Sequence, residues 1–273
     1  MIKQAIIPLA GLGTRLLPLT SIIPKELLPI NGKPGLEYIL DECINSGIKE
    51  IIFIISDKKQ SIKKYFYNDN FYKKLIKKKK RDKRLRYEYA KIKKYKKMIK
   101  FVYQNKPKGT GDAVLKCMRL IKSNYFLMLM PDDLIIGPNC SKSIIKLHKK
   151  YNSSIIASQK VKKNNVSRWG IFDVKKINKK NFIIKDVIEK PAISSAPSNY
   201  AVVGRYILPK KIFNTLKKQK PGRNGEIHIT DSIRSLISKK NKFIGHIFAG
   251  KYLDCGSMKG YINSSIRISK YKI

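Results

Sequence analysis

The sequence predicts an α/β fold whose first half is a doubly wound parallel sheet. Short apolar segments, typical of buried strands, alternate with amphipathic helical segments along this half. The first strand, loop, helix and second strand follow one another as a βαβ unit, which requires parallel strands and a right-handed crossover. With 273 residues, of which 42% are hydrophobic, the chain is long enough for one large domain with a substantial core.

The first half supplies four predicted strands and two predicted helices. The helix over residues 34–47, PGLEYILDECINSG, carries apolar residues on one face, begins at Pro34 and ends at Gly47. A second helix covers residues 111–121, GDAVLKCMRLI. The strands are the apolar runs at residues 3–10, 49–56, 99–104 and 124–130.

The second half is less regular, because most of its apolar segments are joined by short turns. The expected elements are strands at residues 153–161, 170–174, 181–190, 200–208 and 242–250, a helix at residues 228–240 and a closing helix after Gly256. This pattern indicates a mixed sheet with a substrate-side lobe. We expect that lobe to be built into the same domain, so that residues 1–273 form a single domain.

The chain is strongly basic, with 60 Lys and Arg against 18 Asp and Glu and a formal net charge of +42. Such a charge is typical of proteins that bind nucleic acid, a membrane surface or a polyanionic substrate. However, Lys, Ile, Asn and Tyr, which all have A/T-rich codons, are frequent along the whole chain. We therefore favour genome composition as the source of the charge. Residues 72–100 form a low-complexity stretch that is either a basic helical insert or a mobile surface arm.

The four cysteines, Cys43, Cys117, Cys140 and Cys255, form neither a C-x-x-C pair nor a cluster with zinc spacing. Reduced, partly buried thiols in a cytosolic protein are the expected state. Arg15 interrupts the N-terminal apolar stretch, which argues against a signal peptide. No apolar run approaches the ~20 residues that a membrane helix needs. We expect a soluble, cytoplasmic protein.

A glycine-rich loop follows the first strand, within the stretch IIPLAGLGTRLLPLTSIIPKELLPI at residues 6–30. Gly11 and Gly13 let the backbone turn sharply and approach a ligand. Backbone N–H groups in such a turn form an anion-binding nest, and Arg15 adds a donor fork suited to phosphate. The dinucleotide fingerprint and the P-loop both require glycine where Leu16 stands. The loop is therefore either a phosphate cradle of another kind or an ordinary turn with a solvated arginine.

The loop is the first of several motifs that run in order along nearly the whole chain. G-x-G-T-R is followed by PKELLP at residues 24–29. The later motifs are QNKPKGTGDAV from Gln104, MPDD from Met130, RWGIFDV from Arg168, VIEKP from Val187, APSNYAVVGRYIL from Ala196, GEIHITDSI from Gly225 and YLDCGSMKGY from Tyr252. This series resembles the bacterial UTP–glucose-1-phosphate uridylyltransferases (UDP-glucose pyrophosphorylases) of the nucleotidyltransferase family. Two positions depart from the family pattern: Ser21 stands where lysine is usual, and Asp112 replaces a common histidine.

The resemblance implies a Rossmann-like α/β/α nucleotidyltransferase fold with a central mixed, mainly parallel sheet and a sugar-binding lobe. Residues 1–135 would form the nucleotide-binding half, with the basic insert at 72–100. Residues 136–273 would form the sugar-phosphate-binding half and the C-terminal helix. The implied reaction transfers UMP from UTP to glucose 1-phosphate and gives UDP-glucose and pyrophosphate. The sugar phosphate attacks the α-phosphorus in line, and with a second pKa of about 6 it needs no general base.

The resemblance also implies roles for individual residues of this sequence. The nucleotide-binding set is Ala10, Gly11, Leu12, Gly13, Thr14, Glu26, Gln104 and Gly109. The catalytic set is Arg15, Lys25, Asp132 and Lys190, and the sugar-phosphate-binding set is Gly170, Glu189, Lys190, Val203 and Gly204. Gln104 should read the uracil edge, because an amide both donates and accepts. Without the resemblance, Gln104 reads as a surface amide and Glu189–Lys190 as an exposed ion pair.

A Mg²⁺ site is expected at Asp132 and Asp254. Asp132 follows an apolar strand, at the carboxyl end where open α/β sheets bind ligands, and Asp254 matches a family aspartate. Two carboxylates facing a triphosphate would repel it without a cation, and Mg²⁺ accepts carboxylates together with phosphate oxygens. Asp133 should point away from the cleft. The alternative is that Asp132 and Asp133 only cap the next turn.

Two other functions stay open at this point. One is a thymidylyltransferase that acts on the same sugar phosphate. The other is a non-catalytic basic nucleic-acid-binding protein, although the sequence carries no recognised RNA- or DNA-binding motif. The expected partners are UTP and glucose 1-phosphate in a homo-oligomer, a dimer or tetramer, with no membrane and no specific nucleic acid.

Overall fold

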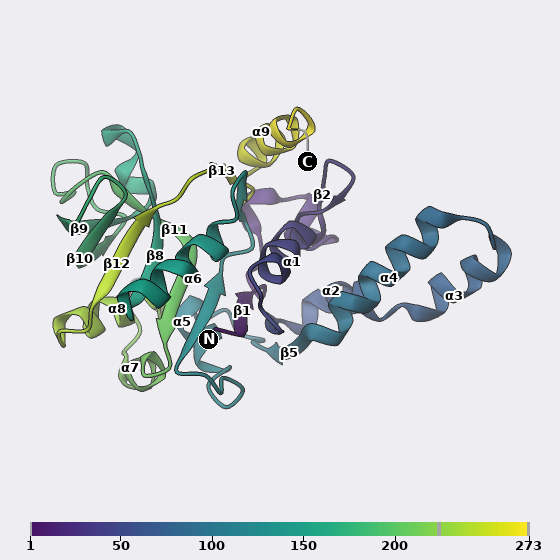
Figure 1. Ribbon diagram of the computed structural model, residues 1–273, viewed down its shortest axis with the longest axis horizontal. Coiled ribbons are helices and arrows are strands. Elements are labelled where there is room, and N and C mark those ends of the chain that lie inside the picture. The colour runs from purple at the N-terminus through teal and green to yellow at the C-terminus, as the bar shows by residue number, and fades with distance from the viewer. Residues whose placement is uncertain (1, 223–224, 272–273) are drawn as a thin grey trace.

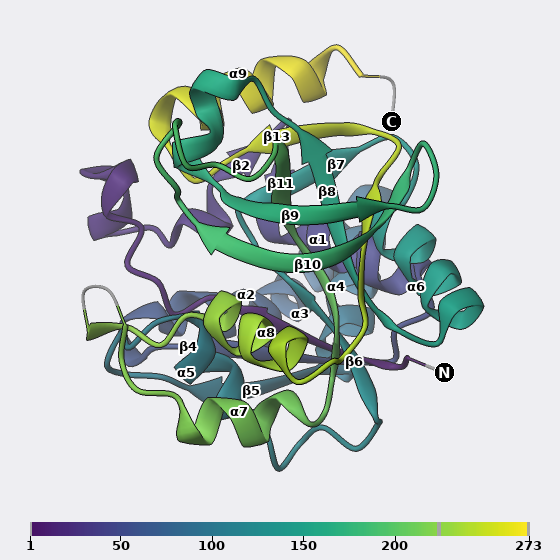
Figure 2. The same ribbon diagram turned by 90° about the vertical axis from the view of Figure 1, so that its left-hand side faces the viewer.

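A nine-stranded sheet runs through the computed structural model, which describes residues 2–222 and 225–271 (Figure 1). Its strands are, in spatial order, β5 (Ile99–Tyr103), β4 (Glu50–Ile55), β1 (Gln4–Pro8), β6 (Tyr125–Leu129), β11 (Tyr200–Pro209), β8 (Ser154–Lys160), β12 (Phe243–Ile247), β10 (Asn181–Glu189) and β9 (Gly170–Lys176). Each predicted strand is therefore present. The β9–β10 hairpin forms the edge of the sheet opposite β5 (Figure 2).

The sheet is mixed in a way that separates its two halves. Neighbouring strands among β5, β4, β1 and β6 pair in parallel, as the first half of the sequence predicts. Beyond them, β11 runs antiparallel to β6 and β8, and β10 runs antiparallel to β12 and β9. The mixed sheet predicted for the second half is therefore confirmed. The mainly parallel character expected of the whole sheet is not fully confirmed, because a β9–β10 hairpin replaces a helical crossover and, among the described strands of this half, only β8 and β12 pair in parallel.

Helices cover both faces of this sheet. One layer contains α1 (Gly35–Asn45), α2 (Gln60–Tyr67), α4 (Lys83–Met98) and α6 (Cys140–Tyr151), and the other contains α5 (Thr110–Leu115), α7 (Ile212–Lys218) and α8 (Ile229–Ser238). Side chains alternate along β1, so that Ala5 and Ile7 pack into the first layer and Ile6 packs into the second. The predicted α/β/α arrangement is confirmed. The helix predicted to reach residue 121 ends at Leu115, because tighter turns follow it.

The predicted basic insert is a helical hairpin, which we call the basic arm (residues 69–98). It consists of α3 (Asp69–Lys78) and α4, and it projects from the sheet edge at β5 (Figure 1). No residue of α3 is buried, whereas Ile92 and Tyr95 near the base of α4 pack into the core. The helical interpretation is therefore correct. The predicted C-terminal boundary of the insert, residue 100, is incorrect, because residues 99 and 100 already belong to β5.

Two short sheets complete the fold. β7 (Asp133–Ile136) pairs antiparallel with β13 (Lys251–Asp254), and β2 (Pro29–Ile30) pairs with β3 (Lys33–Pro34). The C-terminal helix α9 (Met258–Ser269) follows β13, close to where it was predicted. All four cysteines are buried free thiols. Among the described helices, none combines the length and apolar character needed to cross a bilayer.

A buried ion pair ties α1 to β11. Arg205 is 0% exposed and donates to both carboxylate oxygens of Glu42, with a distance of 2.8 Å from Nη2 to Oε2. Burial alone would raise the pKa of Glu42, but Arg205 more than offsets it and holds that pKa below its ordinary value. Arg205 also donates to the carbonyl oxygen of Met130 at 3.2 Å. The pair thereby anchors the loop between β6 and β7.

We predict that Arg205→Met lowers the free energy of unfolding by about 3–5 kcal/mol, because it leaves Glu42 buried without a counter-charge. Urea denaturation measures this loss. The matched control is Arg234→Met, which removes an exposed pair of equal length, 2.8 Å to Asp186. That variant should change stability by less than about 1 kcal/mol. Equal losses in the two variants would contradict the assigned role of burial.

Candidate functional site

Lys25 and Asp132 meet at the carboxyl ends of the parallel strands, although 107 residues separate them. Lys25 Nζ donates to Asp132 Oδ2 at 2.7 Å. Lys25 starts a single 3-10 turn at Lys25–Leu27, and Asp132 lies in the loop between β6 and β7. The backbone N–H of Cys255 donates to the carbonyl oxygen of Asp132 at 2.8 Å, which brings the end of β13 to the same place.

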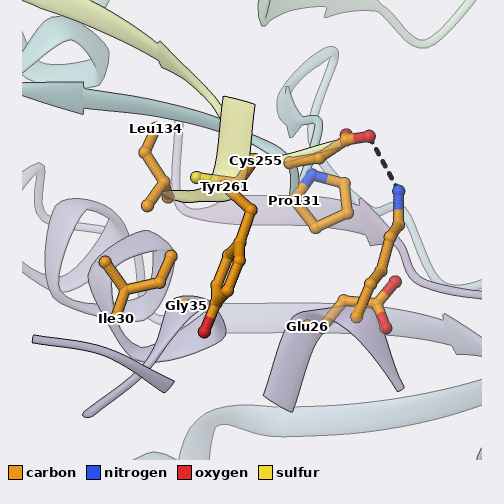
Figure 3. A pocket seen from close by; sticks show the side chains of 9 residues that line it. Glu26, Ile30, Gly35, Pro131, Leu134, Cys255 and Tyr261 are labelled. Atoms are coloured by element: carbon orange, nitrogen blue, oxygen red, sulfur yellow. Dashed lines mark hydrogen bonds and ion pairs between the residues drawn. The ribbon is translucent and has the colours of Figure 1, made fainter. Parts of the chain in front are cut away.

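Lys25 and Asp132 also line a small hollow (Figure 3). The hollow there holds about 10 Å³, which leaves room for about one water molecule. Its labelled walls are Glu26, Ile30, Gly35, Pro131, Leu134, Cys255 and Tyr261. The hollow is too small to hold a nucleotide or a sugar phosphate, so a ligand of that size would contact Lys25 and Asp132 from outside it.

Electrostatics hold both groups of the pair in their charged forms. Burial alone would lower the pKa of Lys25, but Asp132 and Glu26 more than offset it and raise that pKa above its ordinary value. Burial alone would raise the pKa of Asp132, but Lys25 and then Arg15 lower it. The Arg15 guanidinium lies 3.8 Å from Asp132, with its side chain 68% exposed. Arg15 is thus free to move toward an anion, whereas Lys25 is fixed.

Gly256 leaves a space that two carboxylates share. A Cβ atom at position 256 would lie 2.7 Å from Asp132 Oδ2, 3.3 Å from Asp254 Oδ1 and 2.9 Å from Arg15 Nη2. The described residues contain no cluster of three or more His, Cys, Asp and Glu side chains suited to a metal ion. Mg²⁺, however, is commonly held by one or two carboxylates plus substrate phosphates. The donor set therefore fits a cation whose coordination a phosphorylated ligand completes.

Asp133 makes different contacts from its neighbour. Its Oδ2 accepts from the backbone N–H of Gly204 at 2.9 Å, and its Oδ1 accepts from the Tyr252 hydroxyl at 2.6 Å. Burial, together with the nearby charge of Asp132, raises the pKa of Asp133 to about 6. These contacts agree with the expectation that Asp133 points away from the cleft.

The glycine-rich loop leaves a row of backbone donors unused. Within the described part of the chain, no hydrogen bond occupies the N–H groups of residues 11–14. Gly13 adopts a left-handed conformation (φ 72°), and its carbonyl oxygen accepts from the Thr20 hydroxyl at 2.9 Å. Ala10 is buried at the end of β1, while Leu12 and Thr14 are exposed. Unused donors beside Arg15 are the arrangement that an anion-binding nest requires.

The side chain of Glu26, which is expected among the nucleotide-binding residues, is engaged inside the protein. Its carboxylate is buried, and both of its oxygens accept from Lys59 Nζ at 2.8 Å. Burial lowers the pKa of Lys59 despite this contact. Lys59 is one of many lysines, so the sequence did not single it out. The pair supports the segment that carries Lys25.

Gln104 follows β5 and is 5% exposed, so it is not a surface amide. Its amide nitrogen contacts Asp112 Oδ2 at 2.6 Å and the carbonyl oxygen of Gly109 at 3.2 Å. Gly109 has a φ of 94°, and a Cβ there would lie 2.6 Å from the carbonyl oxygen of Ile227. Glycine is therefore required at this position by its packing.

The sugar-phosphate set divides into exposed and internal residues. Gly170 pairs with Glu189 across the β9–β10 hairpin, and Lys190 is exposed with a φ of 47°. A lysine in the left-handed region is uncommon and often marks a functional site. Val203 is fully buried, and both backbone groups of Gly204 are engaged, with Asp133 and with Met130. The backbone of Gly204 is thus already engaged within the protein, and the expected sugar contact by the backbone of residues 203–204 stays a prediction.

Sequence reasoning assigned no role to Arg168, which the fold brings to the site. Arg168 lies 4.0 Å from Asp254 and lines a groove of about 330 Å³ with Trp169 and Tyr252. The RWG motif quoted above contains Arg168, but nothing in the sequence places it beside Asp254. Asp254 was predicted from its place at a strand end, but only the fold shows the space that Gly256 leaves beside it.

Comparison with known proteins gives a consistent result. Residues 4–270 match the family described as nucleotidyl transferase. The chain is 35% identical to the UTP–glucose-1-phosphate uridylyltransferase of Mycoplasma pneumoniae, over 97% of this chain and 91% of the relative, and 35% identical to that of Bacillus subtilis, over 98% and 91%. A crystal structure of UDP-glucose pyrophosphorylase complexed with UDP-glucose superposes with a TM-score of 0.88 at 37% identity, covering 100% of both chains. The UTP-bound enzyme of Acinetobacter baumannii has a TM-score of 0.88 at 33% identity, over 98% and 93%.

We predict that Gly256→Ala weakens Mn²⁺ binding at least tenfold, because the added methyl group occupies the space between Asp132 and Asp254. A titration followed by electron paramagnetic resonance measures free Mn²⁺ directly. The control is Gly11→Ala, whose added Cβ meets nothing within 4 Å. Unchanged Mn²⁺ affinity in a folded Gly256→Ala protein would exclude this space as the cation site.

Proposed function

Because the chain belongs to the nucleotidyl transferase family, we propose that it transfers UMP from UTP to glucose 1-phosphate, giving UDP-glucose and pyrophosphate. The names of its full-length relatives support this reaction and its substrates. The observation that carries the proposal is the convergence of Asp132, Asp254, Lys25 and Arg15 beside unused backbone donors. Two carboxylates, two cations and an anion nest in one place suit the transfer of a nucleotidyl group.

The chemistry requires positioning and charge neutralisation rather than a base. The attacking phosphate oxygen is already anionic near neutral pH. The obstacles are the approach of two polyanions and the charge that develops on the leaving pyrophosphate. Lys25, fixed by Asp132, would lie against the reacting phosphate. Arg15, whose side chain is largely exposed, would neutralise the β- and γ-phosphates held by the N–H groups of residues 11–14.

Asp132 and Asp254 would hold a divalent cation, which we propose to be Mg²⁺. The cation would supply charge neutralisation between the carboxylates and the triphosphate. Asp132 and Asp254 are suited to this because both have an oxygen facing the space beside Gly256. Asp133 would support them from below by holding Gly204 and Tyr252.

The sugar phosphate would bind along the β9–β10 hairpin. Glu189 is exposed next to Gly170, where its carboxylate can accept hydrogen bonds from sugar hydroxyls. Lys190, held in a left-handed conformation, would contact the sugar phosphate. The N–H group of Lys190 donates to the carbonyl oxygen of Trp169 at 2.9 Å, which fixes the backbone of this corner.

We predict that pyrophosphate release requires both substrates and is fastest with UTP among UTP, dTTP, CTP, ATP and GTP, each with glucose 1-phosphate. A coupled phosphate assay measures the rate. Faster turnover with dTTP would favour the thymidylyltransferase alternative. No turnover with any triphosphate would refute the proposed reaction.

We predict that Asp132→Asn loses more than 99% of kcat, because it removes a cation ligand and the counter-charge of Lys25. Asp254→Asn should require at least tenfold more Mg²⁺ for half-maximal activity. Asp133→Asn, the matched neighbour, should retain more activity than either, with its main effect on stability. Activity against Mg²⁺ concentration measures all three. If Asp133→Asn is inactive in a folded protein while Asp132→Asn is nearly normal, the cation site must be moved by one residue.

A further inference from the structure

The contacts of Gln104 define which way its amide points. One terminal atom of this side chain lies 2.6 Å from Asp112 Oδ2 and 3.2 Å from the carbonyl oxygen of Gly109. A carboxylate and a carbonyl oxygen only accept hydrogen bonds. The atom between them must therefore be the NH₂ group, because an amide oxygen there would face two acceptors. Amide orientation is assigned from such networks, and this network allows one choice.

The other end of the side chain is unused. The Gln104 Oε1 atom has no hydrogen bond with any described residue, and it is not among the buried polar atoms sealed from solvent. Both amide hydrogens are directed to Asp112 and Gly109. Gln104 therefore presents an acceptor, and no donor, to a ligand.

The surrounding backbone holds this arrangement in place. The backbone N–H of Gly111 donates to the carbonyl oxygen of Ile227 at 2.7 Å, and the backbone N–H of Ile227 donates to the carbonyl oxygen of Lys108 at 2.9 Å. On the other side, the N–H of Gln104 donates to the carbonyl oxygen of Ile55 at 2.8 Å. Asp112 thus lies in the first turn of α5, whose start is held by backbone hydrogen bonds to Ile227 in the second half of the chain. The Asp112 carboxylate is therefore held in its contact with the Gln104 amide.

We infer that Asp112 is a specificity-determining residue that fixes the amide of Gln104, so that the site accepts pyrimidines with a hydrogen on N3 and rejects cytosine. This inference deepens the proposed function and rests on the placement of the base at Gln104. Uracil and thymine donate from N3, which suits a free Oε1. In the same position cytosine turns a lone pair on N3 toward that oxygen without a hydrogen between them, and its C4 amino group could donate to Oε1 only if the base shifted along its edge. Turning the amide over to suit cytosine would point Oε1 at the Asp112 carboxylate.

The test compares binding of UTP and CTP to the wild-type protein, Asp112→Asn and Asp112→Ala by isothermal titration calorimetry with Mg²⁺ and without sugar phosphate. Asparagine keeps the size of Asp112 but can either accept or donate, so both amide orientations become possible. Alanine removes the acceptor. The matched control is Asp231→Asn, because Asp231 also accepts from a glutamine amide, Gln219 at 3.3 Å, in a pair remote in sequence from Gln104.

The wild-type protein and Asp231→Asn should bind UTP at least a hundredfold more tightly than CTP. In both Asp112 variants this ratio should fall at least tenfold, the scale of one misplaced hydrogen bond, mainly through tighter CTP binding in Asp112→Asn. Circular dichroism and thermal unfolding establish that each variant is folded. An unchanged ratio in either folded variant, or a wild-type protein that binds CTP as well as UTP, would overturn the inference. Discrimination in binding without any turnover would refute the proposed reaction and leave the role of Asp112 standing.

Discussion

The contact between Lys25 and Asp132 is the constraint around which the cleft is arranged. Both side chains are largely shielded from solvent, and each stabilises the ionised form of the other against the desolvation that penalises both charges. At 2.7 Å the pair is a direct charge-assisted hydrogen bond. It joins the first loop of the chain to the loop after β6. The geometry of the site therefore depends on the packing of the parallel half of the sheet.

The supports of this pair come from the rest of the chain. Arg205 reaches the loop before Asp132 through the carbonyl oxygen of Met130, and it is itself neutralised by Glu42. Asp133 binds the bulge region of β11 through Gly204. The β7–β13 ladder then sets Asp254 beside Asp133 in register. An enzyme that must hold several like charges in one cleft uses buried partners of opposite charge to fix them.

The sequence was most informative where local pattern and topology agree. The βαβ order of the first half predicts parallel strands, and parallel strands place their carboxyl ends at one edge, so Lys25 and Asp132 could be expected together. The second half could not be resolved in this way, because antiparallel pairs such as β11 with β6 depend on long-range register that no local pattern encodes. The same limit applies to side chains. The motif series pointed to Glu26 and Gly204 as ligand-binding residues. Only the fold shows that the Glu26 carboxylate accepts from Lys59 and that the Gly204 N–H donates to Asp133.

The departure of Asp112 from the family pattern was visible in the sequence, but its meaning was not. A carboxylate eight residues after Gln104 has many possible orientations, and only the clamp at Ile227 fixes the one that meets the amide. Sequence comparison can thus mark a position as unusual, whereas the hydrogen-bond network decides what the unusual residue does.

The tip of the basic arm is exposed to proteolysis, but a cut there would not separate the two halves of the sheet. Five consecutive cationic residues, 77–81, span the tip between α3 and α4, and all five are exposed. A protease that cleaves after lysine and arginine would therefore cut the chain within residues 77–81. Such a cut would place β1 and β4 on one fragment and β5 and β6 on the other, yet these strands pair directly with one another. Tyr95 and Ile92 would still pack against the core from the second fragment. The two pieces would remain associated through the sheet, so the arm is a site where the chain can be broken while the fold persists.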